Sequence, residues 1–277
     1  MLSYRHGFHA GNHGDVLKHW VLVLCLDYLK QKDKPFFYID THSGSGRYSL
    51  KDAYARKTAE ADDGIVPLWD AKGLPDIFKP YLDLVRDCNK DKLVNYPGSP
   101  ALAAAMLRKS DRLRLIEMHG SDLIALQKLF ARDRRVKVLE GDGFATVKGL
   151  VPPETRRGLV LMDPSYEIKS DYNKVLGAMN ECLKRFVTGQ YVVWYPLINS
   201  VSAQRFSEQL QKLPCENWLD VQLKVSRPPQ GHGMYGSGMF IVNPPWTLRE
   251  QLDQGMPALT QLLAQDDGAD WTVQVSS

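Results

Sequence analysis

The stretch Gly158–Glu167 constrains the fold more than any other part of the sequence. Its unbroken apolar run, Leu159–Met162, predicts a strand buried on both faces, as in a parallel sheet covered by helices. Asp163 follows the run directly, and Pro164 ends the strand and stiffens the turn. Ligands of open α/β sheets bind at the carboxyl ends of the strands, which makes Asp163 a candidate site residue. An ordinary strand end is the alternative, because Asp-Pro is common in turns.

Composition sets the broad class. A chain of 277 residues with 44% hydrophobic residues can form one large or two small domains with a real core. A formal charge of +3 is only weak evidence for a nucleic-acid partner. The apolar run 20–26 is too short to span a bilayer, so no membrane association is predicted. Scattered cysteines without a C-x-x-C pair indicate reduced thiols and a cytoplasmic protein: Cys25, Cys88, Cys182 and Cys215.

The amino-terminal segment 1–14 is rich in glycine and histidine and has no periodicity, which predicts an ordered or mobile arm. A metal site is one interpretation of its histidines, but an H-x-x-H spacing alone is weak evidence. Contacts to a nucleic acid or an adenosine are favoured, and ordinary surface histidines are the third interpretation. A helix with apolar residues on nearly all sides is predicted from Asp15 to about Pro35, capped by Asn12 or Asp15. Lys18 and His19 lie in its first turns, where they face either a site or solvent.

A second predicted strand, Phe36–Asp40, runs into the turn Thr41–Gly46. The Gly-x-Gly of this turn allows close approach to a nucleotide, although it is also common in structural turns. The third glycine of the dinucleotide fingerprint is missing, which disfavours NAD. A Rossmann-type sheet would have its next acidic strand end about 20 residues later. The next convincing strand is 113–117, ending in Glu117, so a helical insertion is predicted between the two strands.

Two more polar positions follow strand or turn signals. The predicted strand 136–140 leads into Gly141-Asp142-Gly143, which suits a hydrogen bond to an adenine amine but by itself is better interpreted as a turn. Ser99 precedes Pro100, a pattern typical of a helix N-cap, and capping is favoured over contact with a ligand. The remaining predicted elements are helices at 121–131 and 172–186, strands at 190–195, 221–225 and 239–242, and a loop at 227–238.

The order of these pieces predicts an α/β fold with carboxylates at successive strand ends. Together they describe a site for a nucleotide-shaped ligand, with Asp163 and Tyr166 where a reacting group would lie. The pattern resembles S-adenosylmethionine-dependent methyltransferases that modify exocyclic amines of bases. Those enzymes carry an Asp/Asn/Ser-Pro-Pro-aromatic motif at this place.

The resemblance narrows to the RlmJ family, bacterial adenine-N6 methyltransferases of 23S ribosomal RNA. It is carried along nearly the whole chain by Tyr4–His6, His9–His13, Asp15–His19, Asp40–Gly46, Tyr96–Pro100, Asp142–Phe144 and Asn243–Trp246. It implies a Rossmann-like methyltransferase fold with a helical insertion after the first strand. We therefore expect residues 1–52 and 95–277 to form the methyltransferase domain and residues 53–94 an inserted helical subdomain.

The resemblance also implies a set of site residues. Asp163 would be catalytic, Tyr4 on the arm would meet the RNA, Pro164 would accept a hydrogen bond from the target amine, and Tyr166 would stack on the base. S-adenosylmethionine is the expected cofactor and no metal is expected. The expected partner is free or partly assembled 23S ribosomal RNA, bound by a monomer. The expected cofactor-binding residues are Lys18, His19, His42, Gly44, Ser99, Glu117, Asp142, Gly143 and Asp163.

One position departs from the family motif, because Ser165 stands where the pattern Asp-Pro-Pro-Tyr has its second proline. Serine keeps the backbone carbonyl but makes the turn less stiff, which bears on the rate more than on the reaction. Two other functions stay open. One is an adenine-N6 methyltransferase of DNA, disfavoured because no separate DNA-reading domain is evident. The other is a non-catalytic nucleic-acid-binding protein linked to the use of external DNA, disfavoured by the intact acidic residues.

Overall fold

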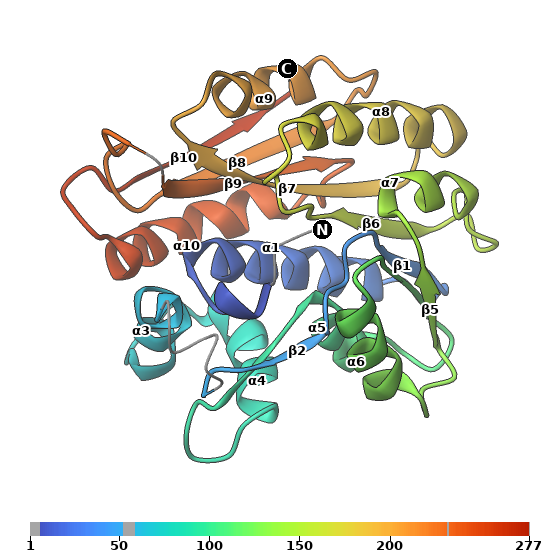
Figure 1. The fold of residues 1–277 in the computed structure, drawn as a ribbon, viewed down its shortest axis with the longest axis horizontal. Helices are drawn as coiled ribbons and strands as arrows, with labels where there is room; N and C mark the ends of the chain where they lie inside the picture. Colours follow the sequence, from blue (N-terminus) through green and yellow to red (C-terminus); the bar gives the residue numbers. More distant parts are fainter. Residues whose placement is uncertain (1–5, 52–58, 232, 277) are drawn as a thin grey trace.

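A central sheet of eight strands lies between two layers of helices in the computed structural model, which describes residues 6–51, 59–231 and 233–276 (Figure 1). The strands of this sheet are β1 (Phe37–Asp40), β4 (Arg112–Glu117), β5 (Val136–Glu140), β6 (Gly158–Met162), β7 (Gln190–Ile198), β8 (Trp218–Lys224), β9 (Met234–Val242) and β10 (Asp270–Val275), while β2 (Arg47–Ser49) and β3 (Asn95–Pro97) pair separately. The helices are α1 (His13–Lys30), α3 (Ile65–Asp70), α4 (Lys79–Asp87), α5 (Ser99–Met106), α6 (Gly120–Phe130), α7 (Gly143–Thr146), α8 (Ser170–Arg185), α9 (Val201–Gln211) and α10 (Leu248–Leu263).

The strand order β10-β8-β9-β7-β6-β1-β4-β5 contains a parallel part and an antiparallel part. Strands β5, β4, β1, β6 and β7 are parallel, and β9 then pairs antiparallel with both β7 and β8. The chain moves from β1 outward to β4 and β5, then returns to β6 on the other side of β1. The carboxyl ends of β1 and β6 therefore flank the topological switch point, where open α/β sheets bind their ligands. The predicted α/β class and Rossmann-like fold are confirmed.

Each face of the sheet has its own hydrophobic cluster. Helices α1, α5 and α10 pack on one face with Leu113 and Leu159, and α8 and α9 pack on the other face with Ile39 and Val160 (Figure 1). Alternate residues of one strand supply both clusters, since successive strand side chains point to opposite faces. This two-sided burial explains the unbroken apolar run in β6, all five of whose residues are buried.

Helix α1 begins at His13, two residues before the predicted start, because Asn12 caps it by accepting a hydrogen bond from the Asp15 backbone N–H at 2.9 Å. It is buried nearly all round, as its sequence predicts. It packs on the sheet beside α10, and Trp20 is fully buried where the two helices meet. Burial of almost every side chain forces Lys18 and His19 to find polar partners inside the protein.

Helices α3 and α4 lie between β2 and β3, in the region where the sequence predicts an insertion. Ile65, Phe78 and Tyr81 from this region share one hydrophobic cluster with α1 and the sheet. The division into a domain of residues 1–52 and 95–277 and a subdomain of residues 53–94 stays a prediction.

The carboxyl-terminal third contains most of the differences from the predicted elements. Strand β9 begins at Met234, so the second part of the predicted loop 227–238 is strand that pairs with β7 and β8. Its glycines Gly236 and Gly238 look like loop residues, but Cβ atoms there would meet backbone at 2.2 Å and the Tyr195 ring at 2.2 Å. Helix α10 contains Pro257, and β10 is a partly exposed edge strand. Within the described residues no helix is both long and apolar enough to cross a membrane.

The contact between α10 and α1 provides a test of packing. A Cβ at Gly255 would lie 2.4 Å from the Trp20 ring, whereas a Cβ at the exposed Gly177 of α8 would meet nothing within 4 Å. Alanine in a helix is worth up to about 1 kcal/mol over glycine, but overpacking costs about 1–3 kcal/mol. We expect Gly255→Ala to lower the free energy of unfolding and Gly177→Ala to raise it, measured by urea denaturation. Equal effects of the two substitutions would contradict this packing.

Candidate active site at the strand ends

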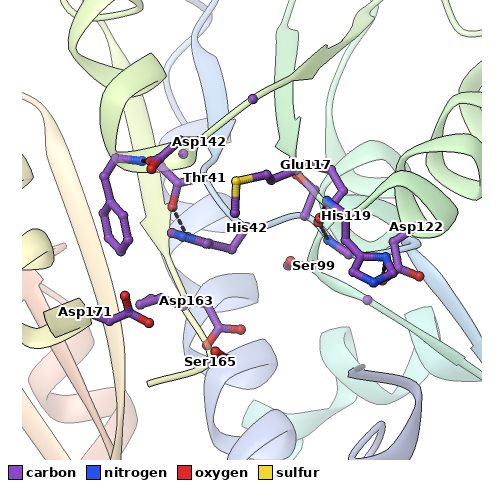
Figure 2. Close-up of a pocket in the computed structure, with 18 of the residues that line it drawn as sticks. Thr41, His42, Ser99, Glu117, His119, Asp122, Asp142, Asp163, Ser165 and Asp171 are labelled. Carbon is purple, nitrogen blue, oxygen red and sulfur yellow. Dashed lines mark hydrogen bonds and ion pairs between the residues drawn. The ribbon is translucent and has the colours of Figure 1, made fainter. Parts of the chain in front are cut away.

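A cavity of about 170 Å³ opens at the carboxyl ends of β1, β4, β5 and β6 (Figure 2). It brings together residues that are far apart in the sequence, from α1, four strand ends, α5 and α8. We call it the first cavity. Its lining contains Pro164. It also contains every predicted cofactor-binding residue: Lys18, His19, His42, Gly44, Ser99, Glu117, Asp142, Gly143 and Asp163.

Asp40 ends β1 and is fully buried beneath this cavity. Its carboxylate accepts hydrogen bonds from the hydroxyls of Tyr38 and Ser99, both at 2.7 Å, and from the His42 backbone N–H at 3.2 Å. Burial raises the pKa of Asp40 to about 6, although these donors favour the charged form. Ser99 is the first residue of α5, after Gly98, and makes no capping hydrogen bond. The predicted N-cap role of Ser99 is therefore wrong, because its hydroxyl joins α5 to the end of β1.

Glu117 ends β4, the strand next to β1, and its carboxylate is held by the backbone. Oε2 accepts a hydrogen bond from the Gly44 N–H at 2.7 Å, and Oε1 accepts one from the His119 N–H at 2.7 Å. Gly44 has a φ of +59°, a conformation that glycine adopts without strain. Burial raises the pKa of Glu117 against these hydrogen bonds. Each oxygen keeps a lone pair that a ligand hydroxyl could use.

Asp142 follows β5 and caps the short helix α7, because its Oδ1 accepts hydrogen bonds from the N–H groups of Phe144 at 2.8 Å and Ala145 at 3.1 Å. Gly143 is required by close contact, since a Cβ there would lie 2.0 Å from the Thr41 carbonyl oxygen. The turns after β1 and β5 therefore touch through backbone alone. The Phe144 ring packs edge-on against His42, with their centroids 4.7 Å apart.

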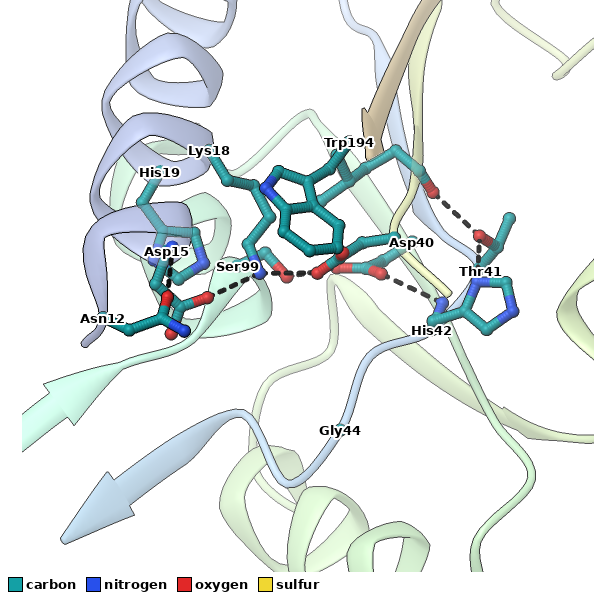
Figure 3. A network of polar contacts seen from close by, with 12 residues as sticks. Asn12, Asp15, Lys18, His19, Asp40, Thr41, His42, Gly44, Ser99 and Trp194 are labelled. Atoms are coloured by element: carbon teal, nitrogen blue, oxygen red, sulfur yellow. Dashed lines mark hydrogen bonds and ion pairs between the residues drawn. The ribbon is translucent and has the colours of Figure 1, made fainter. Parts of the chain in front are cut away.

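Lys18 links α1 to the carboxyl end of β6 (Figure 3). Its ammonium lies 2.6 Å from Asp15 and 2.5 Å from Asp163, and its side chain is only 4% exposed. Burial alone would lower the pKa of Lys18, but the two carboxylates outweigh burial and raise it. The Asp163 ion pair uses Oδ2, while Oδ1 makes no hydrogen bond within the described residues.

Two of the three histidines that line the first cavity, His19 and His42, are held by neighbouring hydroxyls. His19 Nδ1 lies 2.8 Å from the Tyr96 hydroxyl, and His42 Nδ1 lies 2.7 Å from the Thr41 hydroxyl. Burial lowers the pKa of His42 to about 4, so its imidazole is neutral near pH 7. A neutral imidazole offers one donor and one acceptor, which suits polar contacts rather than binding of an anion.

Tyr166 does not line the first cavity. It is 6% exposed, its ring packs 4.7 Å from Tyr172 and 5.8 Å from Phe206, and its hydroxyl donates a hydrogen bond to the Trp194 carbonyl at 2.7 Å. The ring is largely buried but is part of the lining of a neighbouring cavity, so stacking on a base stays a prediction. Its φ of +55° is strained for a non-glycine residue, and Tyr166 anchors the loop that follows Asp163.

A second cavity, of about 440 Å³, adjoins the first. The two linings have Lys18, Asp163 and Ser165 in common. The rest of the second cavity is lined by residues from the start of the described chain and α1, the insertion, the loop after β6, and strand β7, with Met234 and Gln265 at its edge. Asp163 is thus accessible to two neighbouring spaces, which suits a reaction between two bound molecules.

The sequence predicts most of the first cavity but little of the second. Asp171 and Lys174 of α8 also line the first cavity and lie 3.0 Å apart, and no spacing signal in the sequence marks them. In the second cavity, Glu60 and Trp194 were not predicted either. Tyr4 lies outside the described residues. Among the residues that the structure describes, no three His, Cys, Asp or Glu side chains gather in a way that could hold a metal ion.

Known proteins resemble this chain in sequence and in structure. The family model RsmJ, described as "Ribosomal RNA large subunit methyltransferase D, RlmJ", matches residues 33–275. A Haemophilus influenzae protein named "Ribosomal RNA large subunit methyltransferase J" is 45% identical over 276 residues, covering 99% of this chain and 98% of the relative. An Escherichia coli protein of the same name is 44% identical over 260 residues, covering 94% and 93%. A Legionella pneumophila crystal structure is 36% identical, with a TM-score of 0.90 over 97% of this chain and 99% of that chain.

Substitution of Ser165, in the loop after β6, tests what it means that this chain lacks the second proline of the family motif. Neither the backbone N–H nor the hydroxyl of Ser165 has a hydrogen-bond partner among the described residues. A proline there would remove no hydrogen bond and would restrict the unfolded chain. We expect Ser165→Pro to raise the free energy of unfolding by up to about 1 kcal/mol, measured by urea denaturation.

Ser165→Ala is the matched control, because it removes the hydroxyl and leaves the backbone unrestricted. It should leave stability unchanged. A loss of stability in Ser165→Pro but not in Ser165→Ala would mean that the backbone at this position is incompatible with proline.

Proposed function

The chain belongs to the RlmJ family of ribosomal RNA large subunit methyltransferases, and we propose that it transfers a methyl group from S-adenosylmethionine to the N6 amine of an adenine in 23S ribosomal RNA. The observation that carries this proposal is the position of Asp163, between two adjoining cavities at the switch point of the sheet. One cavity would hold the cofactor and the other the target base.

The first cavity fits the chemistry of the cofactor. Glu117 is a fixed acceptor for ribose hydroxyls, and Asp142 is an acceptor for the adenine amine. Met118, Phe144 and Ile168 supply apolar surface for a ring. Lys18, His19 and Ser99 line the part toward α1 and supply polar groups for an amino-acid moiety. When bound there, S-adenosylmethionine supplies an electrophilic methyl group on its sulfonium.

The target amine needs acceptors, because the lone pair of adenine N6 is delocalised into the ring and makes the nitrogen a poor nucleophile. The Oδ1 atom of Asp163 and the Pro164 carbonyl can each accept one N6 hydrogen. These hydrogen bonds favour a tetrahedral nitrogen whose lone pair points at the methyl group. Asp163 also stabilises the positive charge that develops on the nitrogen and can accept its proton.

Lys18 orients this acceptor. Its ammonium holds Oδ2 of Asp163, which leaves Oδ1 for the amine. Asp15 accepts a second hydrogen bond from the same ammonium, so the buried positive charge has two negatively charged partners. A carboxylate fixed before the substrate arrives needs no reorganisation during the reaction. Orienting the amine and the methyl group in line removes a further entropic part of the barrier.

A base inside the second cavity must leave the stack of its own strand. Single-stranded or loop RNA offers such bases at lower cost than a duplex does. The proposal includes the target, which is N6 of an adenine in free or partly assembled RNA. It also includes a monomeric enzyme located in the cytoplasm. Assays with 23S ribosomal RNA and with DNA of the same sequence distinguish it from a DNA methyltransferase, and a complete lack of transfer would favour a binding protein.

Asp163→Asn tests the catalytic assignment. The amide keeps the shape of the side chain but loses the charge that stabilises the transition state. We expect the single-turnover rate on 23S ribosomal RNA to fall about 100-fold or more. Circular dichroism should show a folded protein, since Asp15 still pairs with Lys18. A folded variant that retains substantial turnover would refute the role of Asp163.

Glu117→Gln tests the cofactor site, and Glu140→Gln is its matched control. The two residues are register partners at the ends of β4 and β5, but only Glu117 lines the first cavity. Losing a charged hydrogen bond to the ribose should weaken binding of S-adenosylhomocysteine by about 1–3 kcal/mol in calorimetry. Glu140→Gln should bind like the wild type. Equal affinity of both variants would place the ribose elsewhere.

A further inference from the structure

The second cavity is formed by segments that are distant in the sequence. His9, Asn12 and His13 from the beginning of the described chain face it, together with Glu60 of the insertion and Trp194 of β7. A volume of about 440 Å³ is in the range of small-molecule sites. Because Asp163 lines both cavities, a base whose amine meets Asp163 from this side would share the space with the groups on this wall.

Most polar groups on this wall are paired within the protein. Glu60 accepts a hydrogen bond from Asn12 at 3.0 Å and lies 2.8 Å from His9 Nδ1. Asp15 accepts a hydrogen bond from the Gly11 N–H at 2.9 Å and forms the ion pair with Lys18. These contacts connect the insertion, the start of the chain and α1. They need no ligand to be satisfied.

His13 differs from these paired groups. It is 6% exposed, and its Nδ1 is sealed from solvent without a hydrogen-bond partner. Its Nε2 also makes no hydrogen bond with the described residues, but this atom is not completely buried. Since His13 lines the cavity, we take Nε2 as the nitrogen that faces it. The indole Nε1 of Trp194, on the same wall, also has no partner. The two sealed nitrogens are closed to a ligand, so the polar atom that this part of the wall offers is Nε2 of His13, on a ring that is otherwise buried.

The protonation of His13 decides what it offers to a ligand. Burial lowers the pKa of His13 to about 4, although the charges of Glu60 and Asp15 act in the opposite direction. The ring is therefore neutral near pH 7 and carries one hydrogen. With that hydrogen on Nε2, the ring presents a single N–H donor to the cavity. A donor without charge suits an aromatic ring nitrogen better than a phosphate.

We propose that His13 recognises the target adenine by donating a hydrogen bond from Nε2 to a ring nitrogen of the base. This inference rests on the proposed function, because it assumes that the amine of the base meets Asp163. Asp163 and Pro164 would then accept the hydrogens of N6, while His13 donates to an acceptor on the same ring. N1, next to the amine, is the expected acceptor.

This pattern explains selection of adenine over guanine. Guanine carries an oxygen where adenine carries its amine and a hydrogen on N1. It would therefore bring an acceptor to the acceptors of Asp163 and Pro164, and a donor to the donor of His13. A site of fixed polar groups rejects such an analogue strongly, because its buried groups are left unpaired. His13 would be a substrate-binding residue that determines specificity, whereas Asp163 acts on the reacting amine.

The experiment tests whether the His13 side chain and one ring nitrogen of the base take part in the same interaction. Wild-type protein, His13→Phe and His13→Gln are each assayed in single turnover on RNA oligonucleotides whose target is adenosine or its 1-, 3- or 7-deaza analogue. His13→Phe keeps the flat ring but loses the donor, and His13→Gln keeps an N–H donor. On adenosine we expect His13→Phe to be about 10- to 100-fold slower, with His13→Gln recovering part of the loss.

One deaza analogue should slow the wild type by a similar factor, and on that RNA His13→Phe should cause no further loss. Such coupling identifies the nitrogen and supports the proposal. Cofactor affinity and the melting temperature should stay unchanged in His13→Phe. The control Val187→Ala, an exposed residue just before β7, should behave like the wild type on every RNA.

Two results would overturn the proposal: full activity of His13→Phe on adenosine, or the same fold loss of that variant on all four RNAs, which indicates a purely structural role. If His13→Phe does not fold, the coupling is measured with His13→Leu, which also lacks an N–H donor. The proposed function fails in a different way, since the wild type itself would then leave unmodified RNA unmethylated.

Discussion

The ammonium of Lys18, buried between the carboxylates of Asp15 and Asp163, connects the fold to the candidate chemistry. A lone charge at this depth would be very costly, so Lys18 is tolerated only with both partners in place. One partner belongs to the first turn of α1, which Asn12 caps, and the other follows the central strand β6. The interaction therefore fixes α1 against the switch point of the sheet and orients Asp163 toward both cavities.

The rest of the site is built mainly by backbone groups at strand ends. Glu117 is held by two backbone N–H groups, Asp142 caps α7, and Asp40 is held by two hydroxyls and one N–H. The contact between Gly143 and the Thr41 carbonyl brings two of these turns together. Fixed donors and acceptors of this kind are the arrangement that binding and catalysis require, because they do not reorganise when a ligand arrives.

The insertion contributes to the site as well as to the core. Its apolar side chains join the hydrophobic cluster around α1, and its Glu60 bonds His9 and Asn12 at the start of the described chain. One wall of the second cavity thus depends on a segment that interrupts the Rossmann-like order. This arrangement leaves His13 on the wall of the second cavity, which Asp163 also lines, without a hydrogen-bond partner among the described residues.

Periodicity and strand-end acids in the sequence determine the α/β fold, the buried α1 and the first cavity, because each signal is local and parallel strands bring their carboxyl ends to one edge. The sequence cannot show pairings between distant segments. It suggests a cap for Ser99 where the structure has a hydrogen bond to Asp40, and it does not show that the Tyr166 hydroxyl bonds the Trp194 carbonyl. The second cavity was decided only by tertiary packing, since its walls include α1, the insertion, the loop after β6 and β7, which no local pattern relates.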